Sequence, residues 1–331
     1  MQSALKRFFD FPDTLWSYFQ QVDLRFTPTP HLTASDAALT PSLTDLSSVR
    51  AVLWDVYGTF SGVDLGDMEQ SLQHEDRLLA AARATVQEFS LQETLQRLDT
   101  SLPPETTLRD LYTQLIADSH LRSLAQGIEY PEVQIEQIWL ALIQQCLAHG
   151  LSLPSDEPPL YSAYRWAYFF ESALQQMYLY PHAAQTVHLL KQSGIIQGII
   201  SNAQFYTPVH LRRMLRQALD RPDLQLQHFF LESLVLFSFE MGFSKPNIRT
   251  FERALEILSR QGITPPEILY IGNDMLNDIW PASRCGLRTM LFAYDPSQTT
   301  LRTDDPRCRD LKPDSVVTDM PQITSQILNN R

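Results

Sequence analysis

Cysteine is scarce in this 331-residue chain, and the three that occur, Cys146, Cys285 and Cys308, lie far apart. None belongs to a C-x-x-C pair. The pattern argues against a disulfide framework or a zinc site and favours free thiols in a reducing cytosol.

Positive charge is also in short supply, because 26 Lys and Arg face 38 Asp and Glu, which leaves a net charge of −12. An acidic surface argues against nucleic acid or an anionic membrane as a partner. It does not exclude an anionic small-molecule substrate, since one lysine and a few backbone N–H groups in a cleft can outweigh the repulsion from the net negative charge of the protein. No feature of the sequence indicates the oligomeric state.

Apolar runs of membrane-spanning length are absent from the sequence. The first twenty residues carry two basic residues, but Asp10, Pro12 and Asp13 stand where a signal peptide needs an apolar stretch. We therefore expect this segment to be a short amphipathic docking element of a cytoplasmic protein.

The composition is ordinary for a globular protein, with 44% hydrophobic and 19% charged residues. The sequence patterns divide the chain into three parts. Residues 1–47 form an N-terminal extension that ends in a linker rich in Thr, Ser, Pro and Ala. Residues 65–180 have helical periodicity without a convincing strand, and their aromatic run near 160–180 indicates packing. Residues 48–64 and 181–331 form the remaining part.

Strand and helix patterns alternate in that remaining part. Such alternation predicts an α/β fold with a doubly wound parallel sheet, which binds ligands beyond the carboxyl ends of its strands. The expected strands are "RAVLWDV", "IIQGIIS", "LVLFS", "EILYIGND", "RTMLFAY" and "SVVTD".

Polar side chains stand at or beyond the ends of several expected strands. Because parallel strands direct their carboxyl ends to one edge of a sheet, these side chains can converge on one site. They include a carboxylate able to act as a nucleophile, a hydroxyl with amide donors, a cation, and carboxylates able to hold a divalent ion. This set suits attack on phosphorus by a carboxylate. The residues are Asp55 with Thr59, Ser201 with Asn202, Lys245, and Asp274 with Asp278.

Taken in order, these stretches resemble the motifs of the haloacid dehalogenase superfamily of hydrolases. "WDVYGTF" is similar to the first motif, "IISNAQ" to the second, "FSKPNIRTF" to the third and "YIGNDMLNDI" to the fourth. The resemblance covers residues 51–64 and about 181–295. It implies a Rossmann-like core with residues 65–180 inserted after the first core strand as an all-helical cap.

The resemblance implies catalytic roles for four residues. Asp55 would be the nucleophile, and Thr59 would orient the turn that follows it. Ser201 would bind the anionic group of the substrate, and Lys245 would steady the nucleophile and the transferred group. The reaction implied is hydrolysis of a small phosphorylated metabolite.

The same resemblance implies a Mg²⁺ cofactor. Asp55, the backbone carbonyl of Tyr57 and Asp274 would bind the ion, and Asp278 would support them. Tyr57, Gly58 and Asn202 would contact the substrate.

Tyr57 departs from the pattern of the phosphatases in this superfamily. Most of them have the sequence Asp-x-Asp-Gly-Thr, in which the second Asp serves as general acid and then base. Tyrosine in that place resembles the 2-haloacid dehalogenases, which attack carbon, expel a halide that needs no proton, and use no metal. Because general acid catalysis is worth typically 10²–10⁴-fold, a phosphatase with Tyr57 would be weak or specialised.

Three functions therefore remain open: a Mg²⁺-dependent phosphohydrolase, a 2-haloacid dehalogenase, and a non-catalytic protein that binds Mg²⁺ and phosphate. The acidic stretch "GNDMLND" favours a metal-dependent phosphohydrolase. Phe251, where dehalogenases usually have tyrosine, argues against dehalogenation. The arginine that dehalogenases place early in the cap has no certain counterpart, although Arg77 and Arg83 lie in that region.

Overall fold

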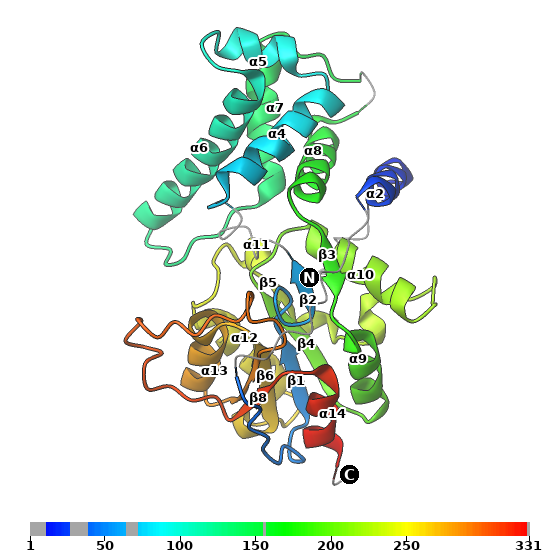
Figure 1. Ribbon diagram of the computed structural model, residues 1–331, viewed down its shortest axis with the longest axis vertical. Helices are drawn as coiled ribbons and strands as arrows, with labels where there is room; N and C mark the ends of the chain where they lie inside the picture. The colour runs from blue at the N-terminus through cyan, green and yellow to red at the C-terminus, as the bar shows by residue number, and fades with distance from the viewer. Residues whose placement is uncertain (1–10, 27–38, 64–71, 155–156, 330–331) are drawn as a thin grey trace.

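The computed structural model describes residues 11–26, 39–63, 72–154 and 157–329. The described chain forms a lower body around a parallel sheet and an upper body made of helices, as Figure 1 shows. No helix in these ranges is long and apolar enough to cross a membrane.

The main sheet has six strands in the order β5-β4-β1-β6-β7-β8, and every neighbouring pair is parallel. This order confirms the predicted doubly wound α/β fold, because the chain runs outward from β1 in both directions. The strands are β1 (Ala51–Trp54), β4 (Ile196–Ser201), β5 (Val235–Phe237), β6 (Ile268–Gly272), β7 (Arg288–Phe292) and β8 (Ser315–Val317).

Both faces of the sheet are covered by helices, which explains why its strands are almost continuously apolar. Successive side chains of β1 point to opposite faces. Val52 and Trp54 belong to one hydrophobic cluster, whereas Ala51 and Leu53 belong to another. The flanking helices are α9 (Ala183–Gln192), α10 (Tyr206–Ala218), α12 (Arg249–Ser259), α13 (Trp280–Arg284) and α14 (Met320–Leu328).

Short helical turns connect several of these elements. The most relevant to the site is a π-helical turn, η4, which begins directly after Asp274 and leads into α13. The turns are η1 (Leu226–His228), η2 (Glu232–Leu234), α11 (Ser238–Met241), η3 (Pro265–Glu267) and η4 (Met275–Ile279).

The upper body is a bundle whose core is aromatic. Trp139 packs against Tyr112 and Phe170, with ring centroids 5.3 Å and 5.2 Å away, and Trp166 is also buried. The aromatic run therefore packs in a core, as its helical spacing predicts. The helices are α4 (Glu75–Glu88), α5 (Gln92–Leu98), α6 (Pro104–Ala125), α7 (Ile135–Ala148) and α8 (Pro159–Leu174).

The expectation that residues 65–180 contain no strand is wrong at one place. Strand β3 (Met177–Leu179) pairs antiparallel with β2 (Ser61–Val63) and forms a separate two-stranded sheet. Three residues are too few to show a two-residue period, and their pairing partner lies more than a hundred residues away in the sequence. This small sheet carries the chain between the two bodies, beside the turn that follows β1.

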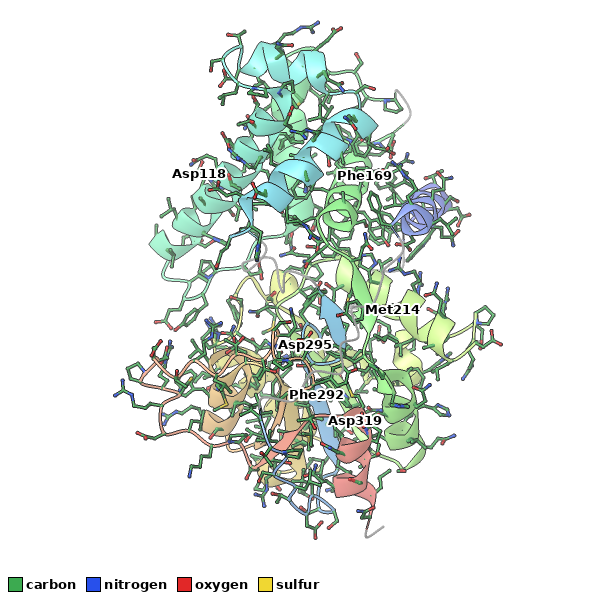
Figure 2. All side chains as sticks on the ribbon, viewed as in Figure 1. Asp118, Phe169, Met214, Phe292, Asp295 and Asp319 are labelled. Atoms are coloured by element: carbon green, nitrogen blue, oxygen red, sulfur yellow. The ribbon has the colours of Figure 1, made fainter. Side chains whose placement is uncertain are left out.

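The N-terminal extension contributes helix α2 (Asp13–Arg25), which docks with Leu15, Phe19 and Val22 buried. The Phe19 ring stacks on Tyr168 of α8 at 4.2 Å. Phe169, labelled in Figure 2, lies 5.0 Å below the Arg25 guanidinium. These contacts agree with an amphipathic docking element. Most of the expected linker, residues 27–38, lies outside the described residues.

Candidate active site

The carboxyl ends of three adjacent central strands bring the predicted site residues together. Asp55 follows β1, Ser201 ends β4, and Asp278 lies one turn beyond β6. Lys245 reaches the same place from the loop between α11 and α12. All four side chains are buried.

The Lys245 ammonium group is the centre of this arrangement. Its Nζ lies 2.6 Å from Asp55 Oδ1 and 2.6 Å from Asp278 Oδ1, and it also donates to the Tyr270 hydroxyl at 3.0 Å. Buried charges are tolerated only when they are paired and hydrogen-bonded. One lysine therefore holds two carboxylates in an orientation that two carboxylates alone could not keep.

The electrostatics of this centre keep Lys245 charged. Burial favours the neutral amine, but the adjacent carboxylates of Asp278 and Asp55 outweigh that effect and raise the pKa of Lys245 above its ordinary value. Burial also raises the pKa of Asp278, and the Lys245 ammonium opposes that rise. Two backbone N–H groups, those of Asn273 and Asp274, donate to Asp278 Oδ2 at 3.0 Å and 2.9 Å.

Thr59 links Asp55 to the loop after β6. Its Oγ1 lies 3.3 Å from Asp55 Oδ2 and 3.0 Å from Asn273 Oδ1, so its single proton can be donated to either oxygen. Gly58 allows this approach because it has a φ of +77°, and a Cβ there would collide with the Asn273 amide. The side chain that meets the Asp55 turn is therefore Asn273.

Ser201 and Asn202 differ in their contacts. The Ser201 hydroxyl donates a long hydrogen bond to the Asn202 carbonyl, at 3.4 Å. The Asn202 side chain instead fixes the backbone of Lys245, accepting from its N–H at 2.7 Å and donating to its carbonyl at 3.3 Å. Asn202 thus positions Lys245. The residues around Asn202 in the sequence give no indication of this contact.

Tyr57 points its hydroxyl at α10, where it lies 2.7 Å from Thr207 Oγ1. Its ring borders a small cavity of about 10 Å³ at the junction of the two bodies. The cavity is lined by Asp23, Phe26, Tyr57, Val63, Glu171, Ser172, Gln175, Gln176, Met177, His210 and Arg213.

Asp274 lies close enough to Asp278 to influence its pKa, but its hydrogen bonds are to other partners. Its Oδ1 accepts from the backbone N–H groups of Leu276 and Asn277 at 2.7 Å and 3.1 Å, which caps the start of η4. Arg302 donates from Nη2 to Asp274 Oδ2 at 2.7 Å and from Nε to both oxygens. The expected metal ligand is thus bound by an arginine.

The described residues, as placed, do not fit a Mg²⁺ site. Mg²⁺ needs near-octahedral oxygen ligands and usually takes one or two carboxylates. Here Asp55 and Asp278 both face Lys245, and Asp274 faces Arg302. Across the described ranges there is no cluster of three or more His, Cys, Asp or Glu residues able to hold a metal.

Three residues of this centre were not predicted from the sequence. Tyr270 lies within β6 and places its hydroxyl 3.0 Å from Asp278 Oδ1 and from the Ile200 carbonyl. The sequence feature that could have identified Tyr270 is a hydroxyl-bearing side chain in an otherwise aliphatic strand. Asn273 directly precedes the expected ligand, whereas Arg302 is far along the chain and had no local signal.

Glu171, near the end of α8, is an acid in the wall of the cavity beside Tyr57. It accepts from Gln175 Nε2 at 3.0 Å and from the Tyr206 hydroxyl. Burial raises its pKa to about 7, and the two hydrogen bonds only partly oppose that rise. At neutral pH this carboxyl is therefore partly protonated.

This placement predicts a pH-dependent effect of Glu171→Gln on stability. The folded chain keeps the Glu171 proton up to about pH 7, whereas the unfolded chain releases it near 4.5. The wild type should therefore lose about 3 kcal/mol relative to the variant as pH rises through this window. Denaturant unfolding across this range measures the difference. The exposed Glu93→Gln is the control, and a pH-independent difference would contradict the assigned burial.

The profile of the haloacid dehalogenase-like hydrolase family matches residues 49–286. Glyceraldehyde 3-phosphate phosphatase of Methanothermobacter thermautotrophicus is 36% identical over 112 residues, covering 34% of this chain and 43% of that protein. Phosphoglycolate phosphatase of Salmonella paratyphi A is 30% identical over 127 residues, covering 38% and 44%. The chain thus aligns with less than half the length of each of these two relatives.

Among solved structures, 2-haloacid dehalogenase from Pseudomonas syringae pv. Tomato DC3000 superposes with a TM-score of 0.51 at 18% identity. The superposition covers 86% of this chain and 100% of that one, and at this identity it shows the fold alone. The family match spans β1 to the end of α13 and includes every element around Lys245. The chain therefore belongs to the haloacid dehalogenase-like hydrolase family.

Proposed function

We propose that this chain hydrolyses small phosphorylated substrates with Asp55 as the nucleophile. The observation that carries the proposal is the buried Lys245 ammonium, 2.6 Å from both Asp55 and Asp278 at the carboxyl edge of the sheet. The two relatives described above are named as phosphatases, which supports phosphate as the reacting group.

In the proposed reaction a carboxylate oxygen of Asp55 attacks phosphorus, and the bond from phosphorus to the leaving-group oxygen breaks. Water then attacks the resulting acyl phosphate, which releases inorganic phosphate and restores the Asp55 carboxylate. Lys245 neutralises charge on the phosphoryl oxygens, and Ser201 donates a hydrogen bond to one of them.

The substrate must enter between the two bodies, because the centre is closed. Gln204, two residues beyond Asn202, donates to Glu132 Oε1 at 3.1 Å and accepts from the Ile135 N–H at 3.0 Å. Ser238 donates to the other Glu132 oxygen at 2.8 Å. We propose that the helices α4–α8 act as a cap on the core, and that this segment before α7 separates from the core when substrate binds.

A second candidate, attack on the carbon of a 2-haloacid, is favoured by Tyr57 and by the poor fit of the described carboxylates to Mg²⁺. Phe251 packs edge-on against Tyr270, with 4.9 Å between ring centroids, and offers no hydroxyl. Arg77 donates to the Leu174 carbonyl and Arg83 to Glu105. These contacts support phosphate transfer over dehalogenation.

The test is turnover of aryl, acyl and alkyl phosphates and of 2-haloacids, each with and without Mg²⁺. We expect phosphate release from aryl and acyl phosphates and no halide release. Halide release without phosphate release would replace the proposal with the second candidate. Absence of both would favour a binding protein.

The variant Tyr57→Asp tests whether Tyr57 replaces a general acid. The phenol of tyrosine, whose reference pKa in water is about 10, is a poor proton donor at neutral pH, so the wild type should prefer leaving groups that depart unaided. The variant should raise hydrolysis of alkyl phosphates roughly 10²-fold more than that of aryl phosphates. Tyr57→Phe is the control for loss of the bond to Thr207. An unchanged alkyl-to-aryl rate ratio in a folded variant would refute this role.

A further inference from the structure

We propose that the Asp55 centre works without a divalent cation, because Asn273 meets the Asp55 turn where a metal needs a carboxylate, and Arg302 binds Asp274. This inference rests on the proposed function of the site and deepens it. The consequence would be a hydrolase whose activity does not respond to chelators.

The carboxylate oxygens of Asp274 and Asp278 are already bound by other groups. Asp278 receives Lys245 on one oxygen and two backbone N–H groups on the other. Asp274 receives two backbone N–H groups and Arg302. A metal that recruited either carboxylate would have to displace these charge-assisted bonds, which are about twice as strong as neutral ones.

The side chain beside the Asp55 turn, Asn273, carries an amide instead of a carboxylate. Thr59 connects Asp55 to Asn273 Oδ1, and the Asn273 amide donates to the Gln298 carbonyl at 2.6 Å. Both ends of this amide are therefore engaged, and its oxygen carries no formal charge. An aspartate at this position would add the second anionic oxygen that a hard cation prefers.

The net charge of this group of carboxylates and cations is small. Three carboxylates, Asp55, Asp274 and Asp278, share the two cations Lys245 and Arg302 through ion pairs. The cluster is thus left with one negative charge. The ammonium group of Lys245 and the guanidinium of Arg302 already neutralise most of the charge that would attract Mg²⁺, so the remaining attraction is weak.

Arg302 binds Asp274 from a strained backbone conformation. Arg302 has a φ of +51°, in the left-handed region that is unfavourable for residues other than glycine. Strained residues of this kind persist where the surrounding structure holds them in place. Here the loop between β7 and β8 accepts the strain and presents the guanidinium to Asp274.

The test is isothermal calorimetry of the full chain with MgCl₂, without substrate. We expect no saturable heat for the wild type at millimolar Mg²⁺ and the same for Asp274→Asn. Asn273→Asp should gain saturable binding, at least about tenfold tighter than any wild-type signal. Gln261→Glu, which adds the same charge at an exposed position, should gain none.

Two results would overturn the inference. One is saturable wild-type binding that Asp55→Asn abolishes, since this would place a cation at Asp55. The other is a folded Asn273→Asp that binds no better than wild type. If Asn273→Asp does not fold, the wild-type titration and the hydrolase activity measured after chelator treatment still decide whether the centre needs a divalent cation. Because binding is measured without substrate, failure here is distinct from failure to hydrolyse phosphate esters.

Discussion

Replacing Asp55 with asparagine is expected to reduce turnover by about 10³-fold or more, with little loss of stability. The amide keeps the shape of the carboxylate but removes the anionic oxygen that attacks phosphorus. Losses of this size follow removal of a catalytic nucleophile in other hydrolases. Lys245 would still be paired with Asp278 through its 2.6 Å contact, so the buried cation keeps a partner. Steady-state rates with an aryl phosphate, together with thermal unfolding, measure both effects.

The matched control is Asp310→Asn, because Asp310 is exposed and is not among the residues of the Asp55 centre. It should leave rate and stability unchanged. A folded Asp55→Asn variant that retains more than a tenth of wild-type turnover would show that another group is the nucleophile.

Replacing Lys245 with methionine is expected to cost about 3–5 kcal/mol of folding free energy and to remove activity. Breaking a buried ion pair by deleting one partner leaves the other charge uncompensated. Here the deletion leaves two carboxylates, Asp55 and Asp278, facing one another at 4% and 1% exposure. Denaturant unfolding of both chains measures the cost.

The cost of Lys245→Met should depend on pH in a definite direction. Without the ammonium, the folded chain avoids the repulsion by keeping a proton on one carboxylate, whereas the unfolded chain releases it. The variant should therefore lose stability relative to wild type as pH rises, with a smaller deficit at about pH 5 than at pH 8. Lys312→Met, at an exposed position, is the control. A deficit under about 1 kcal/mol at pH 8 would show that Lys245 does not hold this centre together.

The core fold was predictable because its signal is local and repeated. Each strand is a short apolar run with a turn after it, and a parallel sheet buried on both faces requires such runs. The same rule predicted that Asp55, Ser201, Lys245 and Asp274 converge with Asp278 in support, since the carboxyl ends of parallel strands share one edge. In the structure Lys245 joins Asp55 and Asp278, whereas Asp274 pairs with Arg302. The short strand β3 escaped prediction because its three residues depend on pairing with β2.

By itself, the sequence determined the α/β core, the helical segment between β2 and β3, and the residue types at the strand ends. Only the tertiary structure decided which of Asn273 and Asp274 meets the Asp55 turn, because adjacent side chains leave a strand end in different directions. Asp274 turns to cap η4 and pair with Arg302, which lies on a loop 28 residues away in sequence. No local pattern encodes that pairing, since it depends on where the β7–β8 loop folds back over the sheet.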